Sequence, residues 1–461
     1  MSVWLLVMVF LRKRLSPNAA RLAESSMTGF SGPPFLPLFF LEAGSFPPTL
    51  FPMEELKMKK NVSLSVFVVS YALSFVLSVA CHSEPEDKPA LGNSENPQTS
   101  EPAQPNEPNE PDEPEKPAEI AKAPEIVLEE PTGGFEVDKM QWFRLEPQVR
   151  SQSPVDSLWT LDGEEISTQK NVVHVFAEAG IYTLTLIATN EAGQSVRNIS
   201  VNVRERNYSN WTNKVYDFVR APGQHANAYP TIPPGSTYAD VLDIVNTSIV
   251  SKNIVSLGAY GGYIVMGFDH TLINGPGNDF LVHGNAFAGF AEPGVIEVSW
   301  DANGNGLPDD PWYEIAGSEY NAATALRNYR LTYYNPATDT AREPGATGTR
   351  WTDNQGNFGY FPATRWPSWL GDTLEVGGSK YENLNPNGSL STAPFAYGYA
   401  DNWPNGDLRA QIDVEWAVDA NGNPVQLKGI DFVKVYTGVF AHAGALGEIS
   451  TEVTGVEDLH L

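Results

Sequence analysis

The chain has 461 residues, of which 56 are acidic and 29 basic, so that its formal net charge is -27 at pH 7. A chain this acidic repels nucleic-acid phosphates and contains no basic stripe to offset the repulsion, so nucleic-acid binding is excluded. The single cysteine excludes an intramolecular disulfide and a multi-cysteine zinc site. At about 150 residues per domain, the length predicts roughly three units.

The one cysteine, Cys81, follows a segment with the pattern of a secretion signal. Lys59 and Lys60 supply positive charge, residues 61–80 carry no charge, and small residues precede the cysteine. Residues 77–81 resemble a lipobox, which implies cleavage before the cysteine and its acylation. We therefore predict a protein that is lipid-anchored in the outer membrane and exposed at the cell surface. The alternative is a transmembrane helix, because about 20 apolar residues can span a bilayer.

On this interpretation residues 58–80 are a lipoprotein signal peptide, and residues 1–57 are an extension that does not belong to the natural protein. Residues 81–123 form an acidic, proline-rich linker with Asn/Asp-Glu-Pro repeats at 106–114. They contain too few large apolar side chains to build a core, so we predict a disordered stalk. The acidic cluster at 83–87 resembles a short signal that sends some bacterial lipoproteins to the cell surface.

Residues 124–204 show the period-two alternation of antiparallel strands, which begins clearly at Val172 and is interrupted by glycine-containing turns. Trp159, the Asp-Gly turn at 162–163 and the segment 179–186 resemble a PKD domain, a small immunoglobulin-like sandwich common on bacterial surface proteins. The resemblance implies a spacer domain without catalytic residues.

Residues 207–461 are long enough to carry the function. Only Tyr238–Lys252 has helical spacing, whereas short apolar runs separated by Gly, Pro and Asn predict strands. The expected strands are 262–268, 279–283, 294–300, 329–334, 411–418 and 430–436. The chain is therefore predicted to be all-β, with the immunoglobulin-like sandwich followed by a larger β-sandwich or jelly-roll domain.

Five motifs of this unit resemble a family of bacterial surface proteins; they lie at 256–262, 274–280, 284–287, 292–294 and 429–433. The family has a galactose-binding-like jelly roll. The unit is also similar to surface lipoproteins that carry a PKD-like domain and are linked to cobalamin capture beside TonB-dependent receptors. The resemblance implies a cobamide ligand and a TonB-dependent receptor as partner, but it identifies no ligand-contact residue.

The segment 301–310 has oxygen side chains at the spacing of a calcium loop. The donors would be four side chains and one backbone carbonyl, those of Asp301, Asn303, Asn305, Asp309 and Leu307. Trp312 stands where a bidentate glutamate is usual, so an ordinary turn is the alternative. The segment 419–423 repeats the start of the motif without the later acid, and we predict a turn there.

No catalytic set is visible in the sequence. His270 and His283 flank a turn, but isolated histidines of this kind are usually satisfied by hydrogen bonds. Glu292 and Glu297 would suit a glycosidase pair only if both faced one sugar, and residues five apart on a strand point to opposite faces. We therefore expect a binding protein rather than an enzyme.

Aromatic residues are concentrated between Trp351 and Trp403, many of them in loops rich in Pro, Gly and Asn. We predict that seven of them stack on the ligand: Trp351, Tyr360, Trp366, Trp369, Tyr397, Tyr399 and Trp403. The alternative is that these rings fill the core beneath long loops.

Two functional classes follow from these patterns. The first is a surface protein that captures a small nutrient, either a cobamide or a glycan, and the second is a surface glycan hydrolase. The absence of a catalytic set in the sequence favours the first class. Only the family resemblance favours a cobamide over a glycan.

Overall fold

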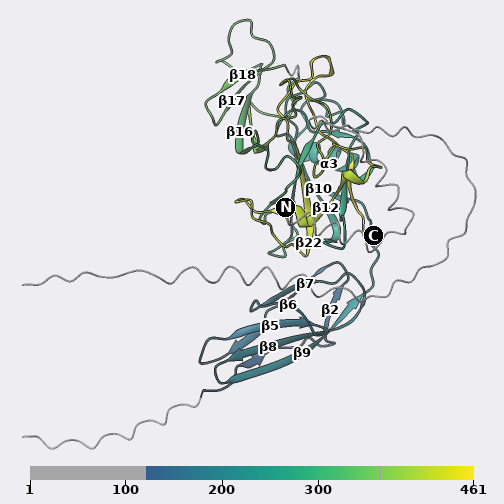
Figure 1. Ribbon diagram of the computed structural model, residues 1–461. Coiled ribbons are helices and arrows are strands. Elements are labelled where there is room, and N and C mark those ends of the chain that lie inside the picture. The colour runs from purple at the N-terminus through teal and green to yellow at the C-terminus, as the bar shows by residue number, and fades with distance from the viewer. Residues whose placement is uncertain (1–120, 363–364) are drawn as a thin grey trace, which may run out of the picture. The chain divides into compact units, whose positions relative to one another are not determined.

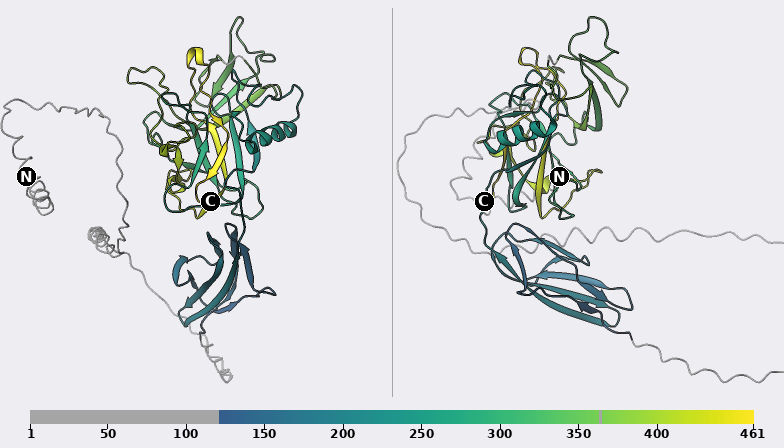
Figure 2. Two further views of the ribbon diagram at one scale, coloured as in Figure 1. Left: turned by 90° about the vertical axis from the view of Figure 1, so that its right-hand side faces the viewer. Right: turned by 180° about the vertical axis from the view of Figure 1, so that it is seen from behind.

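The computed structural model describes residues 121–362 and 365–461. The predicted extension, the signal peptide, Cys81 and nearly all of the linker lie outside these ranges. Within the described residues, no helix is both long and apolar enough to cross a bilayer. The chain is all-β apart from one α-helix and three short 3-10 turns in these ranges (Figures 1 and 2).

The first folded part is an immunoglobulin-like sandwich whose core surrounds Trp159, Leu184 and Leu186, all fully buried. Its strands are β1 (Glu125–Val127), β2 (Phe135–Asp138), β3 (Trp142–Leu145), β4 (Gln148–Arg150), β5 (Asp156–Leu161), β6 (Glu164–Ser167), β7 (Val172–Val175), β8 (Gly180–Asn190) and β9 (Gly193–Arg204). The main sheet has the order β2-β9-β8-β5-β6, and β1 pairs with β4 and β3 with β7. The alternation read from the sequence therefore marks the buried face of this sandwich.

A six-stranded antiparallel sheet organises the second part. Its strands are β10 (Lys214–Val219), β12 (Tyr263–Ile273), β14 (Gly294–Ser299), β15 (Tyr313–Ile315), β21 (Ala417–Val418) and β22 (Gly429–Thr437). They follow the order β10-β12-β22-β14-β15-β21, so that β22, late in the sequence, lies between the earlier strands β12 and β14.

A three-stranded sheet packs against this central sheet and completes a β-sandwich. It consists of β13 (Phe280–His283), β20 (Gln411–Ile412) and β24 (Gly455–Asp458), in the order β20-β13-β24. Phe280 and Val456 from this sheet share one apolar core with Ile264 and Val433 from the central sheet. Burial of these side chains between the two sheets is what holds the sandwich together.

Two further β elements complete the second part. A four-stranded sheet has the order β18-β17-β16-β19 and a core of its own around Leu331, Tyr333 and Val376. Its strands are β16 (Leu326–Tyr334), β17 (Thr349–Asp353), β18 (Phe358–Phe361) and β19 (Thr373–Lys380). A short pair joins β11 (Val255–Ser256) to β23 (Glu452–Val453), which brings Glu452 close to segments far from it in the sequence.

The single α-helix, α3 (Tyr238–Val250), lies beside β10 (Figures 1 and 2). Thr237 caps it, because the Thr237 hydroxyl accepts from the Asp240 backbone N–H while the Asp240 carboxylate accepts from the Thr237 backbone N–H. Val241, Val245 and Ile249 are fully buried on its inner face. The helix predicted from apolar spacing is therefore confirmed.

Five of the six expected strands are present within β12, β13, β14, β16 and β22. The strand expected over 411–418 was a wrong prediction, because a 3-10 turn at Val414–Trp416 divides it. The Asp413 side chain accepts a hydrogen bond from the Glu415 backbone N–H at 2.8 Å and so caps this turn. A side chain that satisfies the backbone locally competes with strand pairing.

Candidate functional site

A cavity of about 430 Å³ in the second part combines carboxylates with aromatic rings; we call it the acidic–aromatic pocket. It is lined by residues of four separate segments: Gln224, His225, Tyr229, Ile254, Asn285, Phe287, Phe290, Glu292, Glu448, Ser450 and Glu452. Its volume lies within the usual range for small-ligand sites.

The carboxylates of Glu292 and Glu452 line this pocket, and the buried carboxylate of Asp401 lies next to them. One oxygen from each of Glu292, Asp401 and Glu452 lies within 4.8 Å of the others. Asp401 is buried, and its carboxylate accepts backbone hydrogen bonds from Asn285 at 2.9 Å, Ala286 at 2.8 Å and Glu452 at 2.9 Å. Asp401 therefore holds two walls of the pocket together while its charge stays close to the other two acids.

Burial controls the protonation of these acids. It raises the pKa of Glu292 to about 7, although the hydrogen bond from the Ser450 backbone N–H opposes the shift. Burial likewise raises the pKa of Asp401 to about 8, with the charge of Glu452 adding to the effect. The pKa of Glu452 lies well above its ordinary value. Burial is the main cause, and the negative charge of Glu292 is the second. Near neutral pH the pocket therefore offers hydrogen-bond donors as well as acceptors.

Exposed aromatic rings stand at the opening. The Phe287 side chain is 62 % exposed, and its ring stacks on Phe290 with 5.5 Å between centroids and 12° between planes. The two residues also exchange backbone hydrogen bonds at 3.2 and 3.0 Å, which closes a tight turn through Gly289 at φ +85°. Tyr229, 53 % exposed, lies against the His225 ring. These rings present flat apolar faces next to the carboxylates.

The wall that carries Tyr229 is held by a buried arginine. Arg220 has no exposed surface, and its guanidinium donates to the carbonyls of Ser256 at 2.8 Å, Ala226 at 3.1 Å and Tyr229 at 2.7 Å. One planar donor group thus ties the loop after β10 to β11. The Tyr229 backbone is therefore held in place by a side chain of the core.

The predicted calcium loop brings its side chains together. The Asp301 carboxylate accepts from the backbone N–H groups of Gly304, Asn305 and Gly306 at 2.9 to 3.1 Å. The amides of Asn303 and Asn305 donate to the Asp309 carboxylate at 2.8 and 2.9 Å. These hydrogen bonds alone hold the oxygen-bearing side chains together in one loop. Calcium binding stays a prediction.

The second copy of the motif forms a turn, as predicted. The Asp419 carboxylate accepts from the backbone N–H groups of Asn421 and Asn423, each at 2.8 Å. The Asp419 backbone N–H donates to the Asn423 carbonyl at 2.9 Å. These bonds are the ordinary chemistry of an Asx turn.

The seven predicted stacking residues do not form one surface, and none of them lines the acidic–aromatic pocket. Tyr399 is only 2 % exposed and packs on Tyr381 and Phe395, so its prediction as a ligand contact was wrong. Trp351 and Trp366 pack against the core of the four-stranded sheet. Dense aromatic sequence here reflects core filling, because large rings bury the most apolar area.

The remaining four of the seven predicted residues lie in four different environments. Trp369 packs against the main core beside Arg220. Tyr360 accepts a hydrogen bond from the Glu343 backbone N–H, and Trp403 lies under the Arg409 guanidinium at 3.3 Å. Tyr397 is 42 % exposed and contacts Trp416 edge-on. A ligand role for these four residues stays a prediction.

The histidines and glutamates considered as catalytic groups are kept apart. His270 hydrogen-bonds to Asp269 and Asp458, and His283 to Glu457, so both are satisfied, as expected. Glu297 pairs with Lys434 at 2.9 Å, away from the acidic–aromatic pocket that contains Glu292. Glu292 precedes β14 whereas Glu297 lies within it, so the two carboxylates occupy separate environments.

Sequence reasoning missed most of the acidic–aromatic pocket. Phe287 and Glu292 belong to motifs at 284–287 and 292–294 that support the family resemblance, and Glu292 was considered only as a partner of Glu297. No sequence signal connects them with Asp401 or Glu452, because a bridge between Gly294 and Ala400 and the hydrogen bonds of Asp401 bring these segments together.

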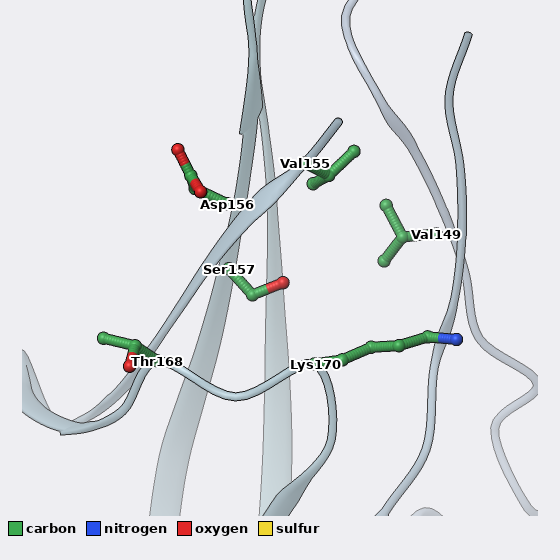
Figure 3. Close-up of a pocket in the computed structure, with 6 residues that line it drawn as sticks. All are labelled: Val149, Val155, Asp156, Ser157, Thr168 and Lys170. Atoms are coloured by element: carbon green, nitrogen blue, oxygen red, sulfur yellow. The ribbon is translucent and has the colours of Figure 1, made fainter. Parts of the chain in front are cut away.

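A second cavity, of about 500 Å³, lies in the immunoglobulin-like part. Figure 3 shows that it is formed by Val149, Val155, Asp156, Ser157, Thr168 and Lys170. The Asp156 carboxylate points away from the Lys170 ammonium, so the two charged groups do not converge. This cavity has no aromatic ring in its lining and only one carboxylate, so it lacks the clustered acids of the acidic–aromatic pocket.

Comparison with known proteins identifies the first part. Residues 122–204 match the PKD domain family, which confirms the PKD-like prediction for this segment. No curated protein matches the chain.

Several solved structures are similar at low identity. One is a quinonprotein alcohol dehydrogenase-like protein from Bacteroides thetaiotaomicron, at 15% identity over 21% of this chain and 23% of that chain, with a TM-score of 0.17. Another is the Bacteroides ovatus mixed-linkage glucan utilization locus SGBP-B in complex with a mixed-linkage heptasaccharide, at 12% identity over 57% of this chain and 48% of that chain, with a TM-score of 0.17. The chain thus spans less than half the length of each of these two proteins.

A third structure comes from carbohydrate-binding modules of the β-sandwich superfamily with promiscuous specificity. It has 11% identity over 74% of this chain and 99% of that chain, with a TM-score of 0.15.

Proposed function

We propose that this protein captures a saccharide in the acidic–aromatic pocket. The observation that carries the proposal is the stacked pair of the exposed Phe287 and the half-buried Phe290 beside the carboxylates of Glu292 and Glu452. Sugars combine an apolar C–H face, which stacks on aromatic rings, with hydroxyl groups that both donate and accept hydrogen bonds. Acids that are partly protonated near neutral pH suit such hydroxyls, because each acid can act as donor or acceptor.

Cobamide capture, which the sequence resemblance implies, is our second proposal. The peripheral amides of a corrin would donate to the carboxylates of Glu292, Glu448 or Glu452. A corrin is far larger than a 430 Å³ cavity, so only its edge would enter the pocket.

We further propose that acylation at Cys81 anchors the protein in the outer membrane. The linker at 81–123 would then hold the folded parts away from the lipid, at the cell surface. There the captured ligand would be passed to a TonB-dependent receptor. The support for these steps is the signal pattern before Cys81 and the family resemblance.

Titration calorimetry with the full chain tests the function. The probes are cellotriose, laminaritriose and cyanocobalamin. We expect one trisaccharide to bind, and Phe287→Ala to weaken that binding by roughly tenfold, since exposed aromatic contacts are frequent hot spots. Phe358→Ala is the matched control, because Phe358 is 66 % exposed on β18, outside the pocket. Binding of cyanocobalamin alone would favour the second proposal, and failure of all three probes would refute both.

A further inference from the structure

A smaller cavity, of about 150 Å³, opens beside β14 and β15. We call it the cross-strand cavity; its lining includes Glu297, Trp312, Glu314, Tyr320, Arg327 and Asn328. Charges of both signs, an amide and two aromatic rings therefore face one space. At about 30 Å³ per water, the cavity is large enough for no more than one sugar ring.

Two carboxylates of this cavity are cross-strand partners. Glu297 on β14 stands directly opposite Glu314 on β15 in the antiparallel register. Opposite residues point to the same face of a sheet, with their Cβ atoms about 4.5 to 5.5 Å apart. In glycosidases that retain anomeric configuration, the two carboxyl groups are about 5 to 5.5 Å apart. Glutamate side chains that start from this Cβ spacing and line one cavity can bring their carboxyl groups to such a separation.

Backbone irregularities make the space in front of the pair. Strand β16 shifts register against β19 between Leu326 and Tyr329, and Asn328 in this bulge has φ +53°. Opposite it, Gly378 has φ +144°, and a Cβ there would lie 2.6 Å from the Tyr436 hydroxyl. Bulges often occur next to active sites, where they redirect side chains. The glycine makes room for the Tyr436 hydroxyl, and both Asn328 and Gly378 line the cavity beside the two carboxylates.

The two glutamates have different surroundings. The Lys434 ammonium lies 2.9 Å from the Glu297 carboxylate and forms an ion pair with it. Glu314 accepts from the Ser379 hydroxyl at 2.5 Å and from the Tyr381 hydroxyl. Burial raises the pKa of Glu314 despite these hydrogen bonds, and the charge of Glu297 adds to the shift. Glu314 therefore tends to keep its proton, as a general acid must, while Glu297 is paired with an ammonium group.

Arg327 completes the wall. Its guanidinium lies 3.7 Å from the centre of the Tyr320 ring and donates to the Tyr381 hydroxyl at 2.9 Å. Tyr381 in turn donates to Glu314, so the arginine, the tyrosine and the acid form one hydrogen-bonded chain. An acid fixed in this way needs little reorganisation when it transfers a proton.

We propose that the cross-strand cavity is a catalytic site that hydrolyses the terminal pyranoside of a glycan with retention of configuration. Glu297 attacks the anomeric carbon and forms a carbon–oxygen bond, while the bond to the leaving oxygen breaks and that oxygen takes the proton of Glu314. Water then attacks the same carbon and gives a proton to Glu314, and Glu297 leaves with its electron pair. The net reaction consumes one water and needs no other reactant. It does not depend on ligand binding in the acidic–aromatic pocket.

Covalent trapping tests this proposal. The full chain is incubated with 2,4-dinitrophenyl 2-deoxy-2-fluoroglycosides of the gluco, galacto, manno and xylo series. Intact-protein mass spectrometry and peptide mapping then follow. We expect one series to add a single glycosyl group at Glu297, and Glu297→Gln to abolish the label. Glu375→Gln is the control, since Glu375 is an exposed glutamate on β19, outside the cavity.

The acid role of Glu314 is tested with the corresponding 4-methylumbelliferyl and 2,4-dinitrophenyl glycosides. Glu314→Gln should lower the rate by about 100-fold to 10,000-fold for the poorer leaving group and much less for dinitrophenolate. Azide should rescue Glu314→Ala and yield a glycosyl azide. Melting curves of each variant separate loss of activity from loss of fold. Labelling at another residue, equal labelling of Glu297→Gln, or no label and no turnover with any series would overturn the proposal.

Discussion

Glu292 and Glu452 are joined through one serine. The Ser450 backbone N–H donates to Glu292 at 2.9 Å, and the Ser450 hydroxyl donates to Glu452 at 2.9 Å. Their carboxylate oxygens, together with one of Asp401, lie within 4.8 Å of one another. Three acids in such a space cannot all ionise without a large repulsion, so the pocket retains protons to an unusually high pH.

The first prediction is that the protein loses stability as the pH rises. In the folded state the pKa is about 7 for Glu292 and about 8 for Asp401, against ordinary values of 4.5 and 3.8. The folded state therefore binds more protons than the unfolded state between about pH 4 and pH 8. The free energy of unfolding should fall across that window, by on the order of 3 kcal/mol for Glu292 and on the order of 6 kcal/mol for Asp401 once each is fully ionised. Urea titrations from pH 4.5 to 8.5 measure the slope.

Glu292→Gln should remove part of this slope, because glutamine keeps an oxygen to accept from Ser450 but does not titrate. Glu375→Gln, at an exposed site on β19, should leave the slope unchanged. A slope that is the same in both variants and in the parent chain would show that the buried acids do not determine the pH dependence.

Much of the fold could be predicted from the sequence, because the patterns there are local. Strict alternation predicted β8 and β9, and apolar spacing after Thr237 predicted α3. The strand expected at 411–418 failed because the Asp413 side chain satisfies the backbone locally. Apolar runs alone could not reveal that competition.

The site was less predictable, because its geometry depends on strand pairing between distant segments. Asp401 contacts the backbone of Asn285, Ala286 and Glu452, and no periodicity in the sequence links these positions. Aromatic density was a poor guide for a physical reason. A ring in a loop can be exposed, as Phe287 is, or buried, as Tyr399 is, and composition does not distinguish the two.

The second prediction separates these two kinds of ring. Tyr399→Ala should lower the free energy of unfolding by about 3–5 kcal/mol, because it leaves a cavity in the core between Tyr381 and Phe395. Tyr397→Ala, two residues away and 42 % exposed, should change it by only about 0.5 kcal/mol. Chemical denaturation of both variants provides the comparison. Equal losses would mean that the burial of Tyr399 does not stabilise the fold.

The third prediction concerns the anchor at Cys81, which lies outside the described residues. Cys81→Ala should prevent acylation, because the thiol is the group that receives the lipid. In cells labelled with a fatty-acid analogue, the parent chain should carry the label and the variant should not. Cys81→Ser is a matched control, since its hydroxyl keeps the size of the side chain but cannot form the thioether. Label that persists in either variant would exclude this cysteine as the anchor.

The fourth prediction concerns calcium at the Asp301 loop. If the loop binds the ion, calcium at about 100 times its dissociation constant should stabilise the folded state by about 2.7 kcal/mol. Asp301→Ala should abolish this increment, because the carboxylate organises the loop through Gly304, Asn305 and Gly306. Asp301→Ala also removes those hydrogen bonds, so the melting temperature of this variant should be lower even in chelator.

Asp419→Ala removes comparable bonds in the second loop and should leave the calcium increment intact. The quantity that decides is thus the difference between melting curves in calcium and in chelator, measured for each variant. If that difference is zero in the parent chain, the Asp301 loop is a turn like the one at Asp419.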